Sequence, residues 1–251
     1  MIESKNKEVK YLEKKILEVS YNPERFKLYY EEDKFLFGIV SPQNDKAPFS
    51  KLMQYKTIYD TLRDLDWKIK ISFKKGIEYA YSKSVQENFS MFQVNSEEEK
   101  LAYYYIENAL FRTSSLWDML AQLYCLFYEI KIPQRKIYYN KIFNPNSSNS
   151  NKFKCKAINI NNYLKQEDNT SLEGEWKGNH QYTNECRNKM THRNSPNITV
   201  MSDYDFNFKS HPSFLLKRII EDYAVVSEYI KEILDEIEYR TNKEINFILK
   251  K

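Results

Sequence analysis

The residues of this chain best suited to chemistry lie close together between Trp176 and His192. An imidazole can take up or release a proton near neutral pH, and a guanidinium can bind an anion through parallel hydrogen bonds. The string RNKMTH combines both types, with Arg187, Asn188 and His192. On a helix, Arg187 would share a face with His180, because seven residues make almost two turns. Asn188 and His192 would share the adjacent face, where the amide can hydrogen-bond or orient the imidazole.

A second set of polar candidates lies on the preceding apolar pattern. Arg112 would occupy an otherwise apolar helical position, where a charge needs a partner. With Glu107 or Asp118 it could line a binding cleft, or it could form a structural salt bridge, and the sequence leaves both readings open. His180 could lie in the same cleft as Arg187, although a packed or solvated histidine is the commoner case.

The spacing of His180, Cys186 and His192 argues against a metal site. Six residues turn a helix through about 600°, so alternate members of this series face different sides and cannot converge on one ion. Asp and Glu do not cluster around the motif at the spacing that a two-metal centre requires. We therefore expect neither a metal nor a cofactor at this site.

The scarcity of glycine indicates an all-α protein. Only 4 glycines occur among 251 residues, and there is no P-loop and no GxGxxG string. Phosphate-binding loops and tight βα turns depend on residues without a Cβ, whereas long helices avoid them. The formal net charge of +4 is far from the basic stripe of a dedicated nucleic-acid binder, so charge alone identifies no partner.

Apolar periodicity and breaker residues predict the elements that must position these residues. The three-to-four-residue spacing predicts helices over 7–19, 50–84, 97–129, 173–192 and 213–240. Alternation around 26–30 and 35–39, with a turn at 31–34, is compatible with a β-hairpin. We expect an amino-terminal extension over 1–49 and one helical domain over 50–251, with an exposed loop at 144–152.

The expected bundle core contains one or two residues from each long stripe. These are Leu62, Ile69, Leu116, Leu123, Ile219 and Ile230. Most of the 21 tyrosines are expected at the edges of this core rather than stacked on nucleic-acid bases.

Localisation follows from what the apolar pattern lacks. The longest apolar stretch, Leu116 to Phe127, is interrupted by Asp118 and Gln122 and cannot cross a bilayer. The first ten residues do not look like a secretory signal. The 3 cysteines are widely spaced and odd in number, so they suit reduced thiols rather than a disulfide framework. We expect a cytoplasmic protein with no membrane partner.

Two strings resemble the HEPN superfamily. RNKMTH, Arg187 to His192, matches its R-x4-6-H pattern and carries the polar residue that often follows the arginine. The string ENALFRTSSLWDMLAQL, Glu107 to Leu123, resembles the first core helix of a stand-alone bacterial HEPN family. The resemblance covers about 97 to 239 and implies a HEPN-like helical bundle, with the first part of the chain as an extension.

The resemblance implies a metal-independent endoribonuclease. His192 would be the general acid or base, Arg187 would bind the phosphate and its developing charge, and Asn188 would position the imidazole or the phosphate. It also implies RNA as partner and a homodimer in which two motifs face one cleft. A role as a toxin or in phage defence, with an antitoxin protein, fits many members. The substrate-binding candidates are Arg112, Glu107, Asp118 and His180.

Two other readings stay open from the sequence. The same scaffold could hold RNA or a protein without cutting it, because HEPN domains that have lost or retuned catalysis are well represented. It could also be a helical interaction protein with a coincidental motif. The intact Arg187, Asn188 and His192 favour the ribonuclease.

Overall fold

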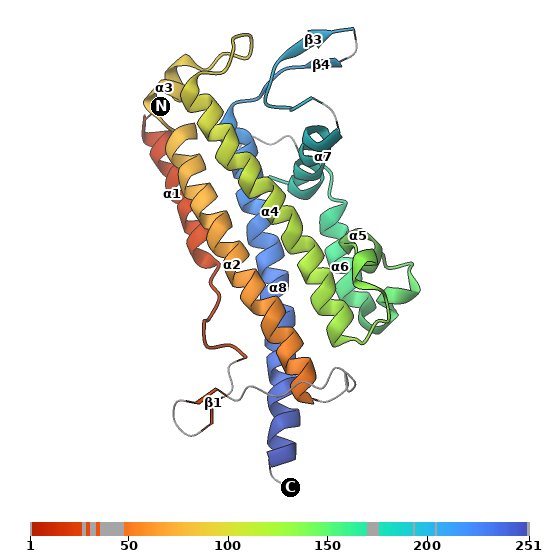
Figure 1. The fold of residues 1–251 in the computed structure, drawn as a ribbon. Helices are drawn as coiled ribbons and strands as arrows, with labels where there is room; N and C mark the ends of the chain where they lie inside the picture. Colours follow the sequence, from red (N-terminus) through yellow and green to blue (C-terminus); the bar gives the residue numbers. More distant parts are fainter. Residues whose placement is uncertain are drawn as a thin grey trace.

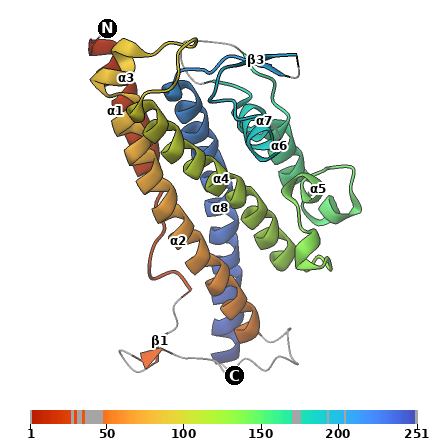
Figure 2. The same cartoon turned by 45° about the horizontal axis from the view of Figure 1, so that its top comes forward.

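Three long helices form the centre of the molecule. The computed structural model describes residues 2–26, 29–30, 34–35, 48–169, 176–192, 194–203 and 205–249. Helices α2 (Pro48–Ala80), α4 (Glu97–Phe127) and α8 (Pro212–Leu249) pack against one another along their lengths, and α1 (Ile2–Glu18) packs on α8 and α2 (Figure 1 and Figure 2). The predicted all-α class is confirmed as a mostly helical fold.

The core lies where the apolar stripes of these helices meet. All six residues predicted for it have 0% exposure: Leu62, Ile69, Leu116, Leu123, Ile219 and Ile230. Leu12 of α1 is equally buried and belongs to the same cluster, so α1 contributes to the core although it precedes residue 50. The expected core is confirmed at each of these positions.

Local signals explain where two of the long helices begin. At the start of α4 the Ser96 hydroxyl accepts a hydrogen bond from the Glu99 amide at 3.2 Å, and the Glu99 carboxylate accepts one from the Ser96 amide at 2.7 Å. This capping box satisfies two amides that a helix start leaves unpaired. Pro212 opens α8, where its missing N–H and fixed φ cost nothing.

Several short elements lie along one side of α4 and α8 (Figure 1). They are η2 (Gln134–Lys136), α5 (Tyr139–Ile142), η3 (Ser148–Phe153), α6 (Lys154–Leu164) and α7 (Asn179–His192). The expected exposed loop at 144–152 is wrong in part, because η3 covers half of it. Ser150 is fully buried there, and its hydroxyl donates to the carbonyls of Asn144 and Ser147 at 2.8 and 2.9 Å.

Two small antiparallel hairpins complete the described chain. β1 (Tyr29–Tyr30) pairs with β2 (Lys34–Phe35), in the region where the sequence was compatible with a hairpin. Residues 31–33 of the expected turn and 36–39 of its second arm lie outside the described residues. β3 (Val200–Ser202) pairs with β4 (Asp205–Asn207) at the end of the bundle where α3 (Lys83–Asn88) lies (Figure 1).

The predicted helices differ from the observed ones mainly at their ends. The first begins at Ile2 rather than 7, and the last continues to Leu249 rather than 240. The helix expected from 173 begins at Asn179, because Gly178 has φ +73°, outside the helical region. None of the described helices is both long and apolar enough to span a bilayer.

Candidate functional site

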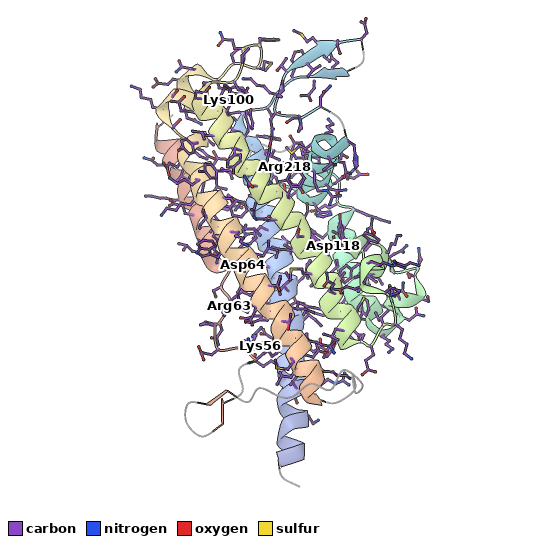
Figure 3. All side chains as sticks on the ribbon, in the orientation of Figure 1. Lys56, Arg63, Asp64, Lys100, Asp118 and Arg218 are labelled. Atoms are coloured by element: carbon purple, nitrogen blue, oxygen red, sulfur yellow. The ribbon has the colours of Figure 1, made fainter. Side chains whose placement is uncertain are left out.

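Helix α7 is fixed to the bundle at its first turn. A Cβ on Gly178 would lie 2.6 Å from the backbone nitrogen of Asp168, so only glycine allows this close approach. The Asn179 amide donates to Glu221 Oε2 at 2.8 Å, and the buried Arg218 guanidinium binds both Asp168 carboxylate oxygens at 2.8 and 2.9 Å. Figure 3 labels Arg218 beside α7. These contacts hold the start of α7 against α8.

The motif residues lie on the accessible part of α7. Arg187 is half-buried, whereas Asn188 and His192 are exposed. The Arg187 guanidinium donates to Asn188 Oδ1 at 3.1 Å. Among the described residues, no hydrogen bond joins His192 to either of them. Five residues turn a helix through about 500°, so Arg187 and His192 point about 140° apart.

His180 lies two turns before Arg187 in a buried hydrogen-bonded cluster. It is 6% exposed, and Asp222 of α8 is 2% exposed. His180 Nδ1 lies 3.3 Å from Asp222 Oδ1, and Nε2 lies 3.1 Å from the Tyr139 hydroxyl. The Asp222 carboxylate also accepts hydrogen bonds from Trp117 Nε1 at 3.2 Å and from the Tyr163 hydroxyl at 3.0 Å. We call Tyr139, His180 and Asp222 the relay cluster.

Tyr139 connects the relay cluster to Asp118 and Arg187. Its backbone N–H donates to Asp118 Oδ1 at 3.2 Å, and Figure 3 places Asp118 on the side of α4 that faces α5 and α6. Burial raises the pKa of Asp118, while the Tyr139 N–H and the Arg187 charge lower it. Burial also raises the pKa of Tyr139 to about 12, against the opposing charge of Arg187. The charge of Arg187 thus acts on both groups.

The other two sequence candidates have different partners. Arg112 Nη1 donates to the carbonyl and to the side-chain oxygen of Asn108, one turn earlier on α4, at 2.9 Å each. Glu107 Oε1 accepts from the Asn197 amide at 2.7 Å. In the described part of the chain, neither contacts a motif residue. The structure thus links Asp118 and His180 through Tyr139, with the charge of Arg187 acting on Asp118. Arg112 and Glu107 have other partners, Asn108 and Asn197.

Sequence reasoning missed the residues that complete this site. Asp222 carried a usable signal, because it falls among Ile219, Tyr223 and Val226 on the apolar stripe of α8, where a carboxylate needs partners. Tyr139 carried none, since α5 has only four residues and follows an irregular segment. Only the packing of α5 against α4 places its hydroxyl beside His180.

The described side chains contain no group of three or more His, Cys, Asp or Glu arranged to hold a metal ion. The arrangement instead offers a cation, a half-buried carboxyl and a phenol backed by an imidazole, which together suit anion binding and proton transfer. Comparison with known protein families, with characterised proteins and with solved structures gave no match.

Proposed function

We propose that this chain is a metal-independent endoribonuclease of HEPN type, with a HEPN-like helical bundle. The observation that carries the proposal is the environment of the Arg187 guanidinium. It is half-buried and hydrogen-bonded to Asn188, yet in the described chain no carboxylate lies within ion-pairing distance of its guanidinium. A cation that is held in place without a direct ion pair to a described carboxylate is available to a phosphate.

The residue types around Arg187 suit cleavage of RNA by its own 2′-hydroxyl. The guanidinium binds the phosphate and the negative charge that develops on it in the transition state. An imidazole can then take the 2′-hydroxyl proton or return a proton to the leaving 5′-oxygen, and His192 is the exposed imidazole of the motif. Asn188, bonded to Arg187, positions the guanidinium. No cofactor is needed for this reaction.

The proposal extends to a homodimer. His192 has no orienting hydrogen bond within the described residues of one chain, and a second chain facing it across a two-fold axis would supply one. Light scattering of the purified protein should give the mass of two chains. A toxin or phage-defence role, restrained by an antitoxin protein, is the cellular setting that the resemblance to HEPN proteins favours.

A second candidate is a non-catalytic module that binds RNA or a protein. The His192 side chain is exposed and has no hydrogen bond to any other described residue. This favours the binding module, because a general acid or base needs a fixed position near the proton that it transfers. The two candidates differ in what the imidazole contributes, and a single substitution separates them.

The test compares wild type with His192→Ala and Arg187→Ala. Induced expression of wild type should arrest growth and degrade RNA, and both substitutions should relieve the arrest at equal protein level. Lys14→Ala removes an exposed side chain on α1, on the other side of the bundle from α7, and should behave as wild type (Figure 1). Equal, harmless behaviour of wild type and His192→Ala would favour the binding module.

A further inference from the structure

The relay cluster spans the distance from the core to the surface of the bundle. Asp222, at 2% exposure, and His180, at 6%, are its buried members. Tyr139 is half-buried, as are its neighbours Asp118 and Arg187. A chain of hydrogen bonds therefore leads from a buried carboxylate, through an imidazole, to the phenol of a half-buried tyrosine, whose pKa the charge of Arg187 lowers.

The contacts of Asp222 fix the direction of these hydrogen bonds. Its two oxygens receive the indole N–H of Trp117 and the hydroxyl of Tyr163, both donors, so the carboxylate acts as acceptor throughout. His180 Nδ1 must then carry a proton and donate it to Asp222. Nε2 is left as an acceptor, and the Tyr139 hydroxyl donates to it at 3.1 Å.

Helix geometry places Arg187 on the face of α7 that carries His180, the partner of this hydroxyl. His180 and Arg187 lie on one face of α7, about 10 Å apart along the axis. Side chains on a helix lean toward its N-terminus, so the long Arg187 side chain extends back toward the level of His180. His192 is 12 positions after His180 on α7, which corresponds to about 18 Å along the helix. The same chain's His192 points about 140° away from Arg187, so His180, with its partner Tyr139, shares the face of Arg187 and His192 does not.

We propose that Tyr139 is a catalytic proton-transfer group for a phosphodiester bound by Arg187, and that His180 and Asp222 are positioning residues that act through it. The inference rests on the ribonuclease activity proposed above. It adds the identity of the protein side chain that receives the 2′-hydroxyl proton. The substrate is an RNA phosphodiester with its adjacent 2′-hydroxyl.

The proton moves in two linked transfers. The 2′-oxygen gives its proton to the Tyr139 oxygen as the Tyr139 proton passes to His180 Nε2. The 2′-oxygen bonds to phosphorus and the bond from phosphorus to the 5′-oxygen breaks. The 5′-oxygen takes a proton from the His192 imidazolium or from water. The imidazolium, stabilised by Asp222, then returns its proton through Tyr139 to water. These steps require neither a redox partner nor a metal ion.

Charged and titratable groups surround Tyr139 from each packed element. Asp118 lies on α4, Tyr163 on α6, Arg187 on α7 and Asp222 on α8. Burial holds the pKa of Tyr139 at about 12, so the phenol keeps its proton at neutral pH. A concerted relay, in which the phenol never becomes a free tyrosinate, fits this high pKa.

The test is single-turnover cleavage of a mixed transfer-RNA pool across pH. The variants are Tyr139→Phe, which removes only the hydroxyl, and Tyr138→Phe as the matched control, since Tyr138 is the exposed neighbour at 47%. Tyr139→Phe should slow cleavage roughly 10²-fold, as loss of a general acid-base group does, with RNA binding unchanged. The melting temperature should fall only slightly, because a single buried acceptor, His180 Nε2, loses its donor. The acid limb of the pH profile, which reports the base that must be deprotonated, should flatten.

A second variant guards against a merely structural effect. Replacing Tyr139 by 3-fluorotyrosine keeps the hydrogen bonds but makes the phenol more acidic, so the alkaline limb of the pH profile should move to lower pH. Cleavage by Tyr139→Phe at the rate of Tyr138→Phe would overturn the relay and leave the ribonuclease standing. Slow cleavage accompanied by lost stability and lost RNA binding would also overturn it. A wild type that cleaves no RNA would overturn both proposals.

Discussion

The Tyr139 hydroxyl lies 3.1 Å from His180 Nε2, although 41 residues separate the two in the chain. This contact joins α5 to α7, and Asp222 joins α7 to α8 through the opposite nitrogen of the same imidazole. One buried histidine thereby connects three elements. The face of α7 that carries His180 also carries Arg187, so the orientation of the candidate phosphate-binding residue depends on this cluster.

Removing the Asp222 carboxylate should destabilise the fold. In Asp222→Ala, the buried donors of Trp117, Tyr163 and His180 lose their acceptor. Each buried polar group without a partner costs about 1 to 3 kcal/mol, so the free energy of unfolding should fall by roughly 3 kcal/mol or more. Urea denaturation at pH 7 measures it. Asp203→Ala, at an exposed turn, is the control, and an equal, small effect of both would contradict the buried cluster.

Removing the buried Lys209 cation should also be costly. Lys209 Nζ is 3.4 Å from both Glu99 carboxylate oxygens, with side-chain exposures of 1% and 5%. Lys209→Met leaves Glu99 buried and uncompensated, a change that costs about 3 to 5 kcal/mol. Adding Glu99→Gln should recover part of the loss, because a neutral amide still caps α4.

The control for Lys209→Met is a surface ion pair on α4, the helix that carries Glu99. Lys100→Met removes the exposed partner of Glu97, and such pairs contribute about 0 to 1 kcal/mol. Chemical denaturation of the four proteins compares the losses directly. If Lys209→Met destabilised no more than Lys100→Met, the ion pair with Glu99 would not support the α4 cap.

Local signals predicted most of the fold, and long-range packing accounts for the rest. The Ser96 capping box and Pro212 marked two helix starts, and 3.6-residue periodicity placed Leu62 and Ile219 in the core. Helix α6 was missed because its string, KCKAININNYL, buries only Ala157 and Ile160, and the three Asn side chains after its first turn weaken an apolar stripe.

The residues of the candidate site also fall into two groups, those that local sequence signals predicted and those that only long-range packing brings in. Arg187 and His192 follow from a short motif, and His180 follows from sharing the face of Arg187. Whether His180 was packed or accessible depended on Trp117 and Asp222, which lie far away in sequence and contact it only in the folded bundle. Helical periodicity can assign a face, but it cannot assign the partner that covers that face.

Alkaline pH should destabilise the protein through Tyr139. Burial raises its pKa to about 12, whereas a tyrosine in an unfolded chain ionises near pH 10. Below about pH 10 the contribution to stability is fully present. Between about pH 10 and 12 the unfolded state loses its proton first, so the free energy of unfolding falls as pH rises. Tyr139→Phe should make this fall less steep than Tyr138→Phe does, as measured by guanidinium denaturation at each pH.

The three thiols should differ sharply in reactivity. Cys155 is exposed, whereas Cys125 and Cys186 are buried and burial raises the pKa of each to about 11. Because the thiolate is the reactive form, one thiol should react rapidly with a disulfide reagent in native protein and two only after unfolding. Cys155→Ser should abolish the rapid phase. Rapid labelling that persisted in this variant would show that a second thiol is open to solvent.

Cleavage of RNA, if the proposed function holds, should need no metal and should require the 2′-hydroxyl. In the described residues no cluster of His, Cys, Asp or Glu is arranged to hold an ion, whereas two-metal chemistry needs several carboxylates within a few ångströms of each other. Activity on a structured RNA should therefore survive EDTA. With imidazole groups as the proton carriers, the 2′-hydroxyl is the internal nucleophile, so the products should carry a 2′,3′-cyclic phosphate and a 5′-hydroxyl.

His192→Ala and Arg187→Ala should each reduce the rate of cleavage by roughly 10²-fold or more. Asn188→Ala should reduce it by less, because Asn188 acts through Arg187. Mass spectrometry identifies the ends of the products, and the initial rate of cleavage compares the variants and the effect of EDTA. A 2′-deoxy substrate is the matched control. Loss of activity on chelation, or cleavage of the 2′-deoxy strand, would exclude this mechanism.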